Sequence, residues 1–470
     1  MVLHMTSLYN TSTKIYSTEI KLLFASFFIL SIICAFISNF SLLLFVYLTL
    51  CIAVIYYGDF RTLVFFTFCN IFQNIFLIIF SPTLSPIESQ LFILFKELII
   101  YLCTFRYLLK KITYKSYEKN QINKFCNILL IFMCLMIAIN MLTPNAPIGA
   151  RITAMRQIIL MPLCYFFGLS LTLSPHCLKK YYLLFIRLMQ IICISGLIIY
   201  YLPDTFWINI NLFTYIQNKS GIMLLELPES FYSYDLGSRM KRLVSIIAEP
   251  VATSHLIGLA CILIFITFKK KFKGTKLLFI TCALLCISKT LLFFSFCSIA
   301  IYIYVHLKNK KLRFIFLTSS LFLLIICIIF LINHFSGMEG NTATGNHLLA
   351  FVYGINNATL IGNGIGTAGF NVASMNEGAD LGYTESFFAV LVAQIGSIGT
   401  GTFYLFLFLK GIYFIQEYRK KNNPYLLSAI IILLSVTFES FISGSAISMI
   451  GTSLYFIIPG IIERNIYKLN

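Results

Sequence analysis

Three cationic side chains stand close together just before a long apolar run. Arg239, Lys241 and Arg242 precede Glu249 and Pro250, where the run begins. A guanidinium group can bind phosphate through two parallel hydrogen bonds, and the attraction is stronger at the low-dielectric edge of a membrane than in water. The cluster therefore indicates a site for a lipid-linked phosphate or pyrophosphate. The alternative is an anchor for the helix end, because basic side chains there commonly reach the lipid headgroups.

Three more cations could complete such a pocket. Arg151 and Arg156 stand at the start of another apolar run, and Lys289 lies between two short ones. A charge amid apolar neighbours is costly in a membrane and normally faces a cavity. Anchoring is the equally good alternative for Arg151 and Arg156, while Lys289 could instead reach headgroup phosphates.

Two carboxylates are candidates for a general base. Glu249 and Glu385 each stand where an apolar segment is predicted to begin, so either could take a proton near the membrane boundary. The alternative is stabilisation by the helix dipole, which favours a negative charge in the first turn. Glu439 has the same two interpretations with less weight on function. His255 lies inside a predicted helix and is interpreted as a buried imidazole with its hydrogen bonds satisfied.

Motifs for metal or nucleotide chemistry are missing from the sequence. No GxxxxGK[ST] loop and no HExxH motif is present, and His334 and His347 have no partner at metal-ligand spacing. The glycine-rich run 362–369 follows no predicted strand, so it does not indicate a dinucleotide-binding fold. We therefore expect a reaction that needs no metal and no cofactor.

The elements that must position these residues are membrane-spanning helices. The chain of 470 residues is 59% hydrophobic with a mean hydropathy of +0.89, far above the ~45–50% apolar content of soluble proteins. The apolar runs are continuous and long enough to cross the hydrocarbon, where a helix satisfies every backbone group. We expect an all-α polytopic integral membrane protein that forms a single membrane domain over 1–470. The predicted segments are 21–37, 40–57, 62–81, 91–109, 125–142, 155–174, 181–202, 251–268, 277–288, 291–306, 314–333, 386–410, 425–440 and 444–461.

The placement of the basic residues predicts the orientation. With the N-terminus inside, the inner connections hold 24 of the 35 lysines and arginines. The outer connections hold six: Arg151, Arg156, Lys219, Arg239, Lys241 and Arg242. This is the positive-inside pattern, which predicts two cytoplasmic termini. The formal charge of +18 is thus explained by topology, and no nucleic-acid partner is expected.

Two long outer loops and one hairpin follow from this orientation. The loops at 203–250 and 334–385 contain many apolar and aromatic residues, so ordered structure is expected in them, with a helix followed by a glycine-rich turn over 347–366. The basic clusters 269–276 and 308–313 both belong inside, so the chain must go out and return, with its tip at 288–290. One long tilted helix is the alternative.

Four motifs in order resemble those of bacterial O-antigen polymerases and the related O-antigen ligases. Arg242-x-x-Ser245-x-x-x-Glu249-Pro250 is similar to their R-x-x-G-x-x-x-E-P motif, and Ser288-Lys289 stands where they often carry Ser-Arg. Gly364-Ile365-Gly366 is similar to a glycine-rich segment of their second large loop. The fourth motif begins at Glu385-Ser386 and ends with Gly396 and Gly399. The resemblance covers about 240–410.

The sequence departs from these motifs at three positions, and the last departure, at Glu385, favours the polymerase branch. Ser245 replaces a glycine, Lys289 replaces an arginine, and Glu385 stands where the ligases have a histidine. The resemblance implies a GT-C-like fold with about 12–14 helices and two large periplasmic loops, in the inner membrane of a bacterium.

The resemblance also implies a substrate and a set of roles. Oligosaccharide repeat units on undecaprenyl pyrophosphate would be joined into O-antigen or capsule, with a flippase and a chain-length regulator as partners beside membrane lipid. Lipid pyrophosphate is a good leaving group whose developing charge cations can stabilise. Glu249 or Glu385 would take the proton of the attacking hydroxyl. The cations in question are Arg242, Arg239, Lys241, Arg151, Arg156 and Lys289.

Three other functions fit the pattern less well. A ligase that moves glycan from the carrier lipid to the lipid A core shares the fold and the chemistry. A flippase of lipid-linked oligosaccharide would be expected to keep charges deep in its helices and to have short outer loops. A secondary transporter would show paired interrupted helices in its two halves, whereas the sequence predicts only one interruption, at 288–290.

Overall fold

The computed structural model describes most of the chain from residue 52 onward. The predicted segments 21–37, nearly all of 40–57 and most of 314–333 lie outside the described residues. The described residues are 52, 55, 56, 58–113, 121–220, 223–233, 239–268, 271–316, 318, 319, 343–369, 372, 376, 382, 385–441 and 443–468.

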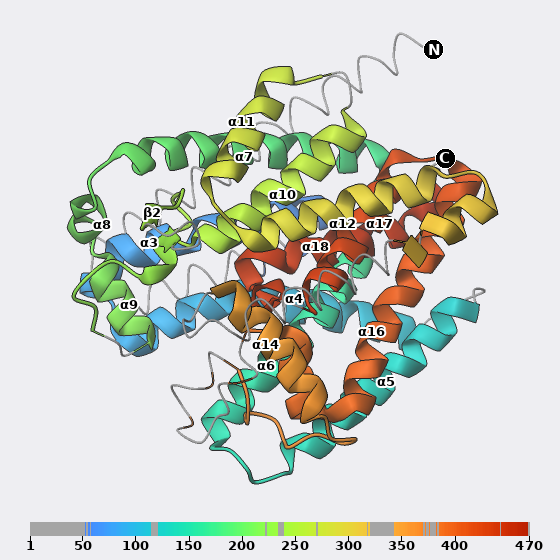
Figure 1. The fold of residues 1–470 in the computed structure, drawn as a ribbon, viewed down its shortest axis with the longest axis horizontal. Coiled ribbons are helices and arrows are strands. Elements are labelled where there is room, and N and C mark those ends of the chain that lie inside the picture. The colour runs from blue at the N-terminus through green and yellow to red at the C-terminus, as the bar shows by residue number, and fades with distance from the viewer. Residues whose placement is uncertain are drawn as a thin grey trace. The chain divides into compact units, whose positions relative to one another are not determined.

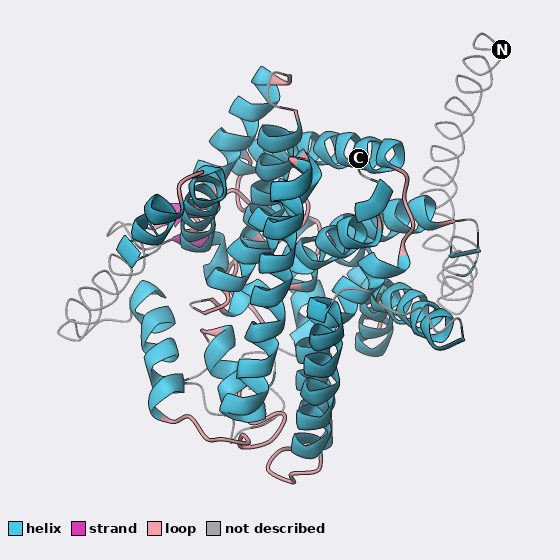
Figure 2. Cartoon of the chain, turned by 90° about the vertical axis from the view of Figure 1, so that its right-hand side faces the viewer, coloured by secondary structure: helices cyan, strands magenta, loops and turns pink. Residues whose placement is uncertain are grey.

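The described residues are mostly helical, with one small pair of strands (Figure 2). Six helices are long and apolar enough to cross a membrane, namely α3, α5, α6, α7, α10 and α16, and α12 and α17 are shorter apolar helices. The all-α polytopic membrane architecture is thus supported among the described residues. The longer elements are α3 (Asp59–Phe80), α4 (Pro86–Thr113), α5 (Gln121–Met141), α6 (Ile148–Ser170), α7 (Pro175–Tyr201), α10 (Pro250–Thr267), α11 (Lys273–Leu285), α12 (Lys289–His306), α14 (Ala343–Asn356), α16 (Phe387–Lys421), α17 (Pro424–Glu439) and α18 (Met449–Arg464).

The chain divides into two compact units. The first draws on Met1–Leu102 and Asp204–Glu226, and the second on Cys103–Pro203 and Leu227–Asn470. The first predicted outer loop is therefore shared between the two units. All the helix ends discussed below as a candidate site belong to the second unit.

In the first unit, the start of the first predicted outer loop packs on the turn between α3 and α4. This part of the loop forms the short helices α8 (Thr205–Asn209) and α9 (Leu212–Ser220). The Asn218 amide nitrogen donates to the carbonyls of Ser81 and Leu84, each at 3.0 Å, and the Ser81 hydroxyl donates to the carbonyl of Asn211. These bonds satisfy backbone groups that the helix ends leave open, and they confirm that this part of the loop is ordered.

In the second unit, α6 and α18 approach each other closely at two glycines. A Cβ on Gly168 would lie 2.2 Å from the carbonyl oxygen of Ile457, and one on Gly460 would lie 2.3 Å from that of Tyr165. Small residues at such contacts let backbones meet and gain van der Waals packing, which drives helix association in membranes where a hydrophobic force is absent.

A buried ion pair fastens the same two helices to α16. Lys410 Nζ lies 2.7 Å and 3.0 Å from the two carboxylate oxygens of Glu463, and the hydroxyl of Tyr165 donates to the same carboxylate. The two ionised side chains are only 6% and 9% exposed. A charge in this environment is tolerated because each partner supplies the hydrogen bonds that water would otherwise give.

Helix α16 is broken at Gly396, and residues 359–363, from the second predicted outer loop, bond to the backbone at the break. Gly396 has φ 72° and ψ 176°, so the amides of Ser397 and Ile398 lose their helical acceptors. They donate instead to the carbonyls of Thr359 and Leu360, while the amide of Asn363 donates to Ala393. Non-helical backbone of this kind is stable inside a membrane protein only where protein covers it. Beyond the break, α16 runs beside α5 (Figure 1).

Several boundaries differ from the predicted ones. Helix α6 begins at Ile148 rather than at residue 155. Its first turns contain the polar residues Arg151 and Thr153 and so lie before the apolar run from which the start was predicted. Helix α16 continues to Lys421 rather than ending at 410, since its last turns are polar and extend past the apolar run. A strand pair, β1 (Tyr232–Ser233) with β2 (Met240–Lys241), lies in the first outer loop and was not predicted.

The predicted break between α11 and α12 is present, so one long helix across this region is excluded. Its position was predicted slightly too late. The chain turns at Cys286–Ser288, where Ile287 has φ 44°, and Lys289 is already the first residue of α12. The predicted helix and glycine-rich turn over 347–366 are also present, as α14 and the turn that follows it.

The contact between α6 and α18 can be tested with a single methyl group. Gly460→Ala places a Cβ against a backbone carbonyl, so we expect a loss of unfolding free energy of about 1–3 kcal/mol. Thermal unfolding in detergent measures this loss. Gly401→Ala is the matched control, because nothing lies within 4 Å of its Cβ. Equal midpoints for the two variants would contradict the close packing.

Candidate functional site where helix ends meet

The first candidate motif is bonded to the turn between α11 and α12. The Arg242 guanidinium donates to the carbonyls of Cys286 at 3.0 Å, Ile287 at 3.1 Å and Ser230 at 3.2 Å. The amide of Leu243 donates to Leu285 at 2.9 Å. Carbonyls at a helix C-terminus carry partial negative charge, which a guanidinium fork neutralises well. Arg242 therefore holds the turn that presents Lys289.

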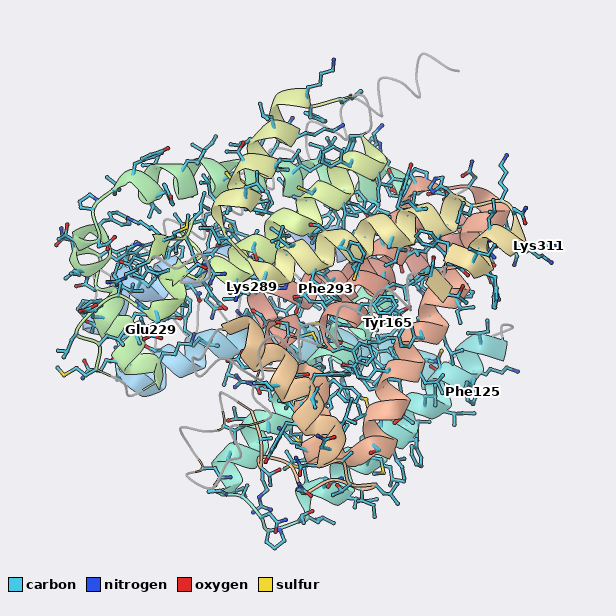
Figure 3. All side chains as sticks on the ribbon, in the orientation of Figure 1. Phe125, Tyr165, Glu229, Lys289, Phe293 and Lys311 are labelled. Atoms are coloured by element: carbon cyan, nitrogen blue, oxygen red, sulfur yellow. The ribbon has the colours of Figure 1, made fainter. Side chains whose placement is uncertain are left out.

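The turn itself is capped and joined to α10 by serines. Ser288 is the N-cap of α12, and its hydroxyl accepts from the amide of Leu291 and bonds to the hydroxyl of Ser254 at 3.1 Å. Lys289 follows at the N-terminus of α12 and is half-buried. It lies at the opposite end of α12 from Lys311 (Figure 3).

The Glu249 carboxylate stands at the entrance to α10. Glu249 is the N-cap residue, but its side chain makes no capping hydrogen bond, and its backbone carbonyl accepts from the amide and hydroxyl of Thr253. Ser245, which replaces the glycine of the related motif, is fully buried, with its hydroxyl 3.0 Å from that of Thr253. The motif thus forms one hydrogen-bonded corner from Arg242 to the first turn of α10.

One turn into α10, a buried histidine meets a buried glutamate. His255 Nε2 lies 2.5 Å from Glu439 Oε1 at the end of α17, and the side chains are 1% and 0% exposed. His255 Nδ1 lies 2.8 Å from the carbonyl of Val251, and Tyr455 on α18 donates to the His255 carbonyl. Sequence reasoning treated the two residues separately; the structure joins them.

The turn after Glu439 binds the fourth motif. The amide of Phe388 donates to the carbonyl of Ser440 at 3.0 Å, and the amide of Gly444 donates to that of Glu385 at 2.9 Å. The hydroxyl of Ser386 donates to the carbonyl of Phe441 at 2.6 Å. Residues 439–441, 443 and 444 therefore connect the start of α16 with the start of α10. We call this segment the connecting turn.

The remaining predicted cations bind protein groups near the same corner. Lys241 Nζ donates to the carbonyl of Leu202 at 2.8 Å, and the Arg239 guanidinium lies 3.9 Å from the centre of the Tyr232 ring. The Lys241 contact ties the strand pair to the end of α7, and the Arg239 contact joins the two sides of the strand pair. Arg239, Lys241 and Arg242 are close in the sequence, but these contacts are with different parts of the protein.

Arg151 lies beside the glycine-rich turn instead. Its guanidinium donates to the carbonyl of Met141 at 3.0 Å, and a Cβ on Gly366 would lie 2.9 Å from its backbone nitrogen. The Asn140 amide reaches the carbonyl of Ile361 at 2.8 Å. Arg156, half-buried, lies further along α6. The structure thus joins Arg151 to the third motif, and it joins Arg242, Lys289, Glu249 and Glu385 through α10, α12 and the connecting turn.

The connecting turn and the pair of His255 with Glu439 are the features that sequence reasoning missed. The available signal was an ionisable residue in each of two apolar segments, which in a membrane usually marks a pair. Among the described residues no three His, Cys, Asp or Glu side chains gather as a metal site. No family model matches this chain, and no curated protein sequence matches it.

The role of Arg242 at the turn can be tested by hydrogen exchange. Arg242→Lys keeps the charge but cannot reach three carbonyls at once, so we expect the amides of 286–291 to exchange at least about tenfold faster, equivalent to about 1.4 kcal/mol. Mass spectrometry of that peptide measures the change. Arg239→Lys is the control, since its guanidinium stacks on Tyr232. Unchanged exchange in Arg242→Lys would show that the guanidinium does not hold the turn.

Proposed function

We propose that the protein polymerises oligosaccharide repeat units carried on undecaprenyl pyrophosphate, for an O-antigen or capsular polysaccharide, at the periplasmic face of a bacterial inner membrane. The observation that carries the proposal is the meeting of three motifs far apart in the chain. Residues 242–250, 288–289 and 385–386 are connected through hydrogen bonds at adjoining helix ends.

The N-terminus of α12 is the best binding point for the pyrophosphate. A helix N-terminus carries partial positive charge and free amides, and Lys289 adds a full charge to it. Arg242 shapes this point by holding the preceding turn, and its fork remains charged beside it. Arg239 and Lys241 add positive charge to the approach for the anionic lipid.

The transfer then needs little beyond positioning and charge stabilisation. The acceptor hydroxyl attacks the anomeric carbon of the growing chain, and undecaprenyl pyrophosphate leaves with the bonding electrons. Cations held in place stabilise the charge that develops on the leaving group. A carboxylate at this end takes the hydroxyl proton; Glu249 and Glu385, both half-buried there, are the two that the sequence predicted.

The proposal is tested with purified protein and lipid-linked repeat units. Lys289→Ala should lower the polymerisation rate by about 10²–10³-fold, since it removes the cation at the leaving group. Lys289→Arg should retain most of the rate, because related proteins often carry arginine at the matching position. Gel separation of the products measures chain length and rate.

Lys311→Ala is the control for loss of charge from the same helix region, as Lys311 is exposed beyond the other end of α12 (Figure 3). It should polymerise at the wild-type rate. Failure of the wild-type protein to extend any lipid-linked unit would reject the function. Normal rates in Lys289→Ala would reject the site while leaving the function standing.

A further inference from the structure

The pair of His255 and Glu439 has no part in the function as proposed so far. It is an ionisable pair with at most 1% of either side chain exposed, set among apolar residues of α10, α17 and α18. A charge or a polar group buried in a membrane protein is costly and generally kept for function. His255 also lies six residues after Glu249, less than two helical turns away, and Glu439 is the first residue of the connecting turn.

The hydrogen bonds fix how many protons the pair holds. Val251 offers only a carbonyl oxygen, so His255 Nδ1 must carry a proton to bond to it. The contact of Nε2 with Glu439 Oε1 then holds one shared proton, on the imidazole or on the carboxyl. In either arrangement the pair is neutral overall, which is how it can persist away from water.

One oxygen of the pair is left over. Glu439 Oε2 is buried and has no hydrogen-bond partner among the residues that the structure describes. Leaving such an atom unpaired costs free energy, and the cost is higher for a charged group. The other titratable groups within electrostatic range of the pair are Glu249, Cys297 of α12 and Tyr455 of α18. The structure therefore keeps one oriented acceptor atom at this point.

A base in this position suits transfer to a sugar better than an exposed one. Glu249 and Glu385 are half-buried, and a carboxylate in contact with water would activate water and hydrolyse the lipid-linked donor. Glu439 is shielded from water and held at one oxygen by His255, so its second oxygen has a fixed direction. Preorganisation of this kind is what a general base requires.

We propose that Glu439 is the proton acceptor of the transfer and that His255 is its positioning residue. The transfer requires the acceptor hydroxyl to reach Oε2, which protein atoms cover in this structure. Its oxygen forms the bond to the anomeric carbon, its proton passes to Oε2, and the bond from that carbon to the pyrophosphate oxygen breaks with its electrons on the leaving group. The inference rests on the proposed function, and it gives Glu249 and Glu385 a role in lining the acceptor site.

The test compares three carboxylates at this end with one outside it. Glu439→Gln is expected to lower kcat by about 10²–10⁴-fold with little change in KM, and to remove the fall in rate at acid pH that protonation of the base causes. Glu249→Gln and Glu385→Gln should keep that acid limb. Glu463→Gln is the matched control, because it removes a buried carboxylate bound to a cation in the same bundle.

His255→Gln tests the positioning role. It should lower kcat, because the carboxylate is no longer held in one orientation, while the acid limb of the pH profile remains. If Glu439→Gln does not fold, Glu439→Asp replaces it: the shorter carboxylate should keep the acid limb at a much reduced kcat.

The outcomes separate this inference from the function on which it rests. Polymerisation by the wild type with an unchanged kcat and acid limb in Glu439→Gln, or a full kcat in Glu439→Asp, would overturn the role of Glu439 alone. Loss of the acid limb in Glu249→Gln or Glu385→Gln would assign the base there instead. A wild type that extends no lipid-linked unit would overturn the function itself.

Discussion

Hydrocarbon offers no hydrogen bonds, so every polar group within this bundle must find its partner in the protein. The contact between His255 and Glu439 is the clearest result of that constraint, because each side chain supplies the hydrogen-bond partner that the other needs. It binds the start of α10 to the end of α17, and the turn that follows α17 binds the start of α16. Together these hydrogen bonds link the segment carrying Glu249 with the segment carrying Glu385.

The same constraint explains the structural roles of two motif residues, Arg242 and Gly396. The Arg242 guanidinium donates to backbone carbonyls at the end of α11, because the last carbonyls of a helix have no acceptor role within the helix and need other hydrogen-bond donors. Gly396 lets α16 break, and the second outer loop supplies the missing acceptors. Arg242 and Gly396 thus support the packing of helix ends, and Lys289 is a second cation at the turn.

A second buried pair, Lys410 with Glu463, fastens helices together. Both of its carboxylate oxygens are bonded, to the ammonium group and to Tyr165. Glu439 differs because only one of its oxygens is bonded among the described residues. That difference separates a carboxylate that fastens helices from one with an acceptor atom to offer.

Much of the fold could be predicted from the sequence because membrane helices depend on length and apolar content. The segments at α3, α10 and α17 match the predicted ones within three residues, and the break before α12 followed from two basic clusters.

The candidate site could be predicted only in part. Position along the chain placed Glu249, Lys289 and Glu385 at helix ends, but the partner of a buried side chain depends on how helices pack. The bond from His255 to Glu439 spans 184 positions of the sequence, and no local pattern encodes it. The carbonyl partners of Arg242 were equally invisible, since every residue carries a carbonyl.

For the proposed function, the N-terminal ends of α10, α12 and α16 must face the outside of the cell. Single cysteines can be placed at Glu229, beside the Arg242 contact, and at Lys311, in a variant without the fourteen native cysteines. Both positions are exposed, and they are labelled in Figure 3. In sealed spheroplasts, a membrane-impermeant thiol reagent should modify the cysteine at 229 and spare the one at 311 until the membrane is opened. Labelling at 311 with protection at 229 would contradict the account.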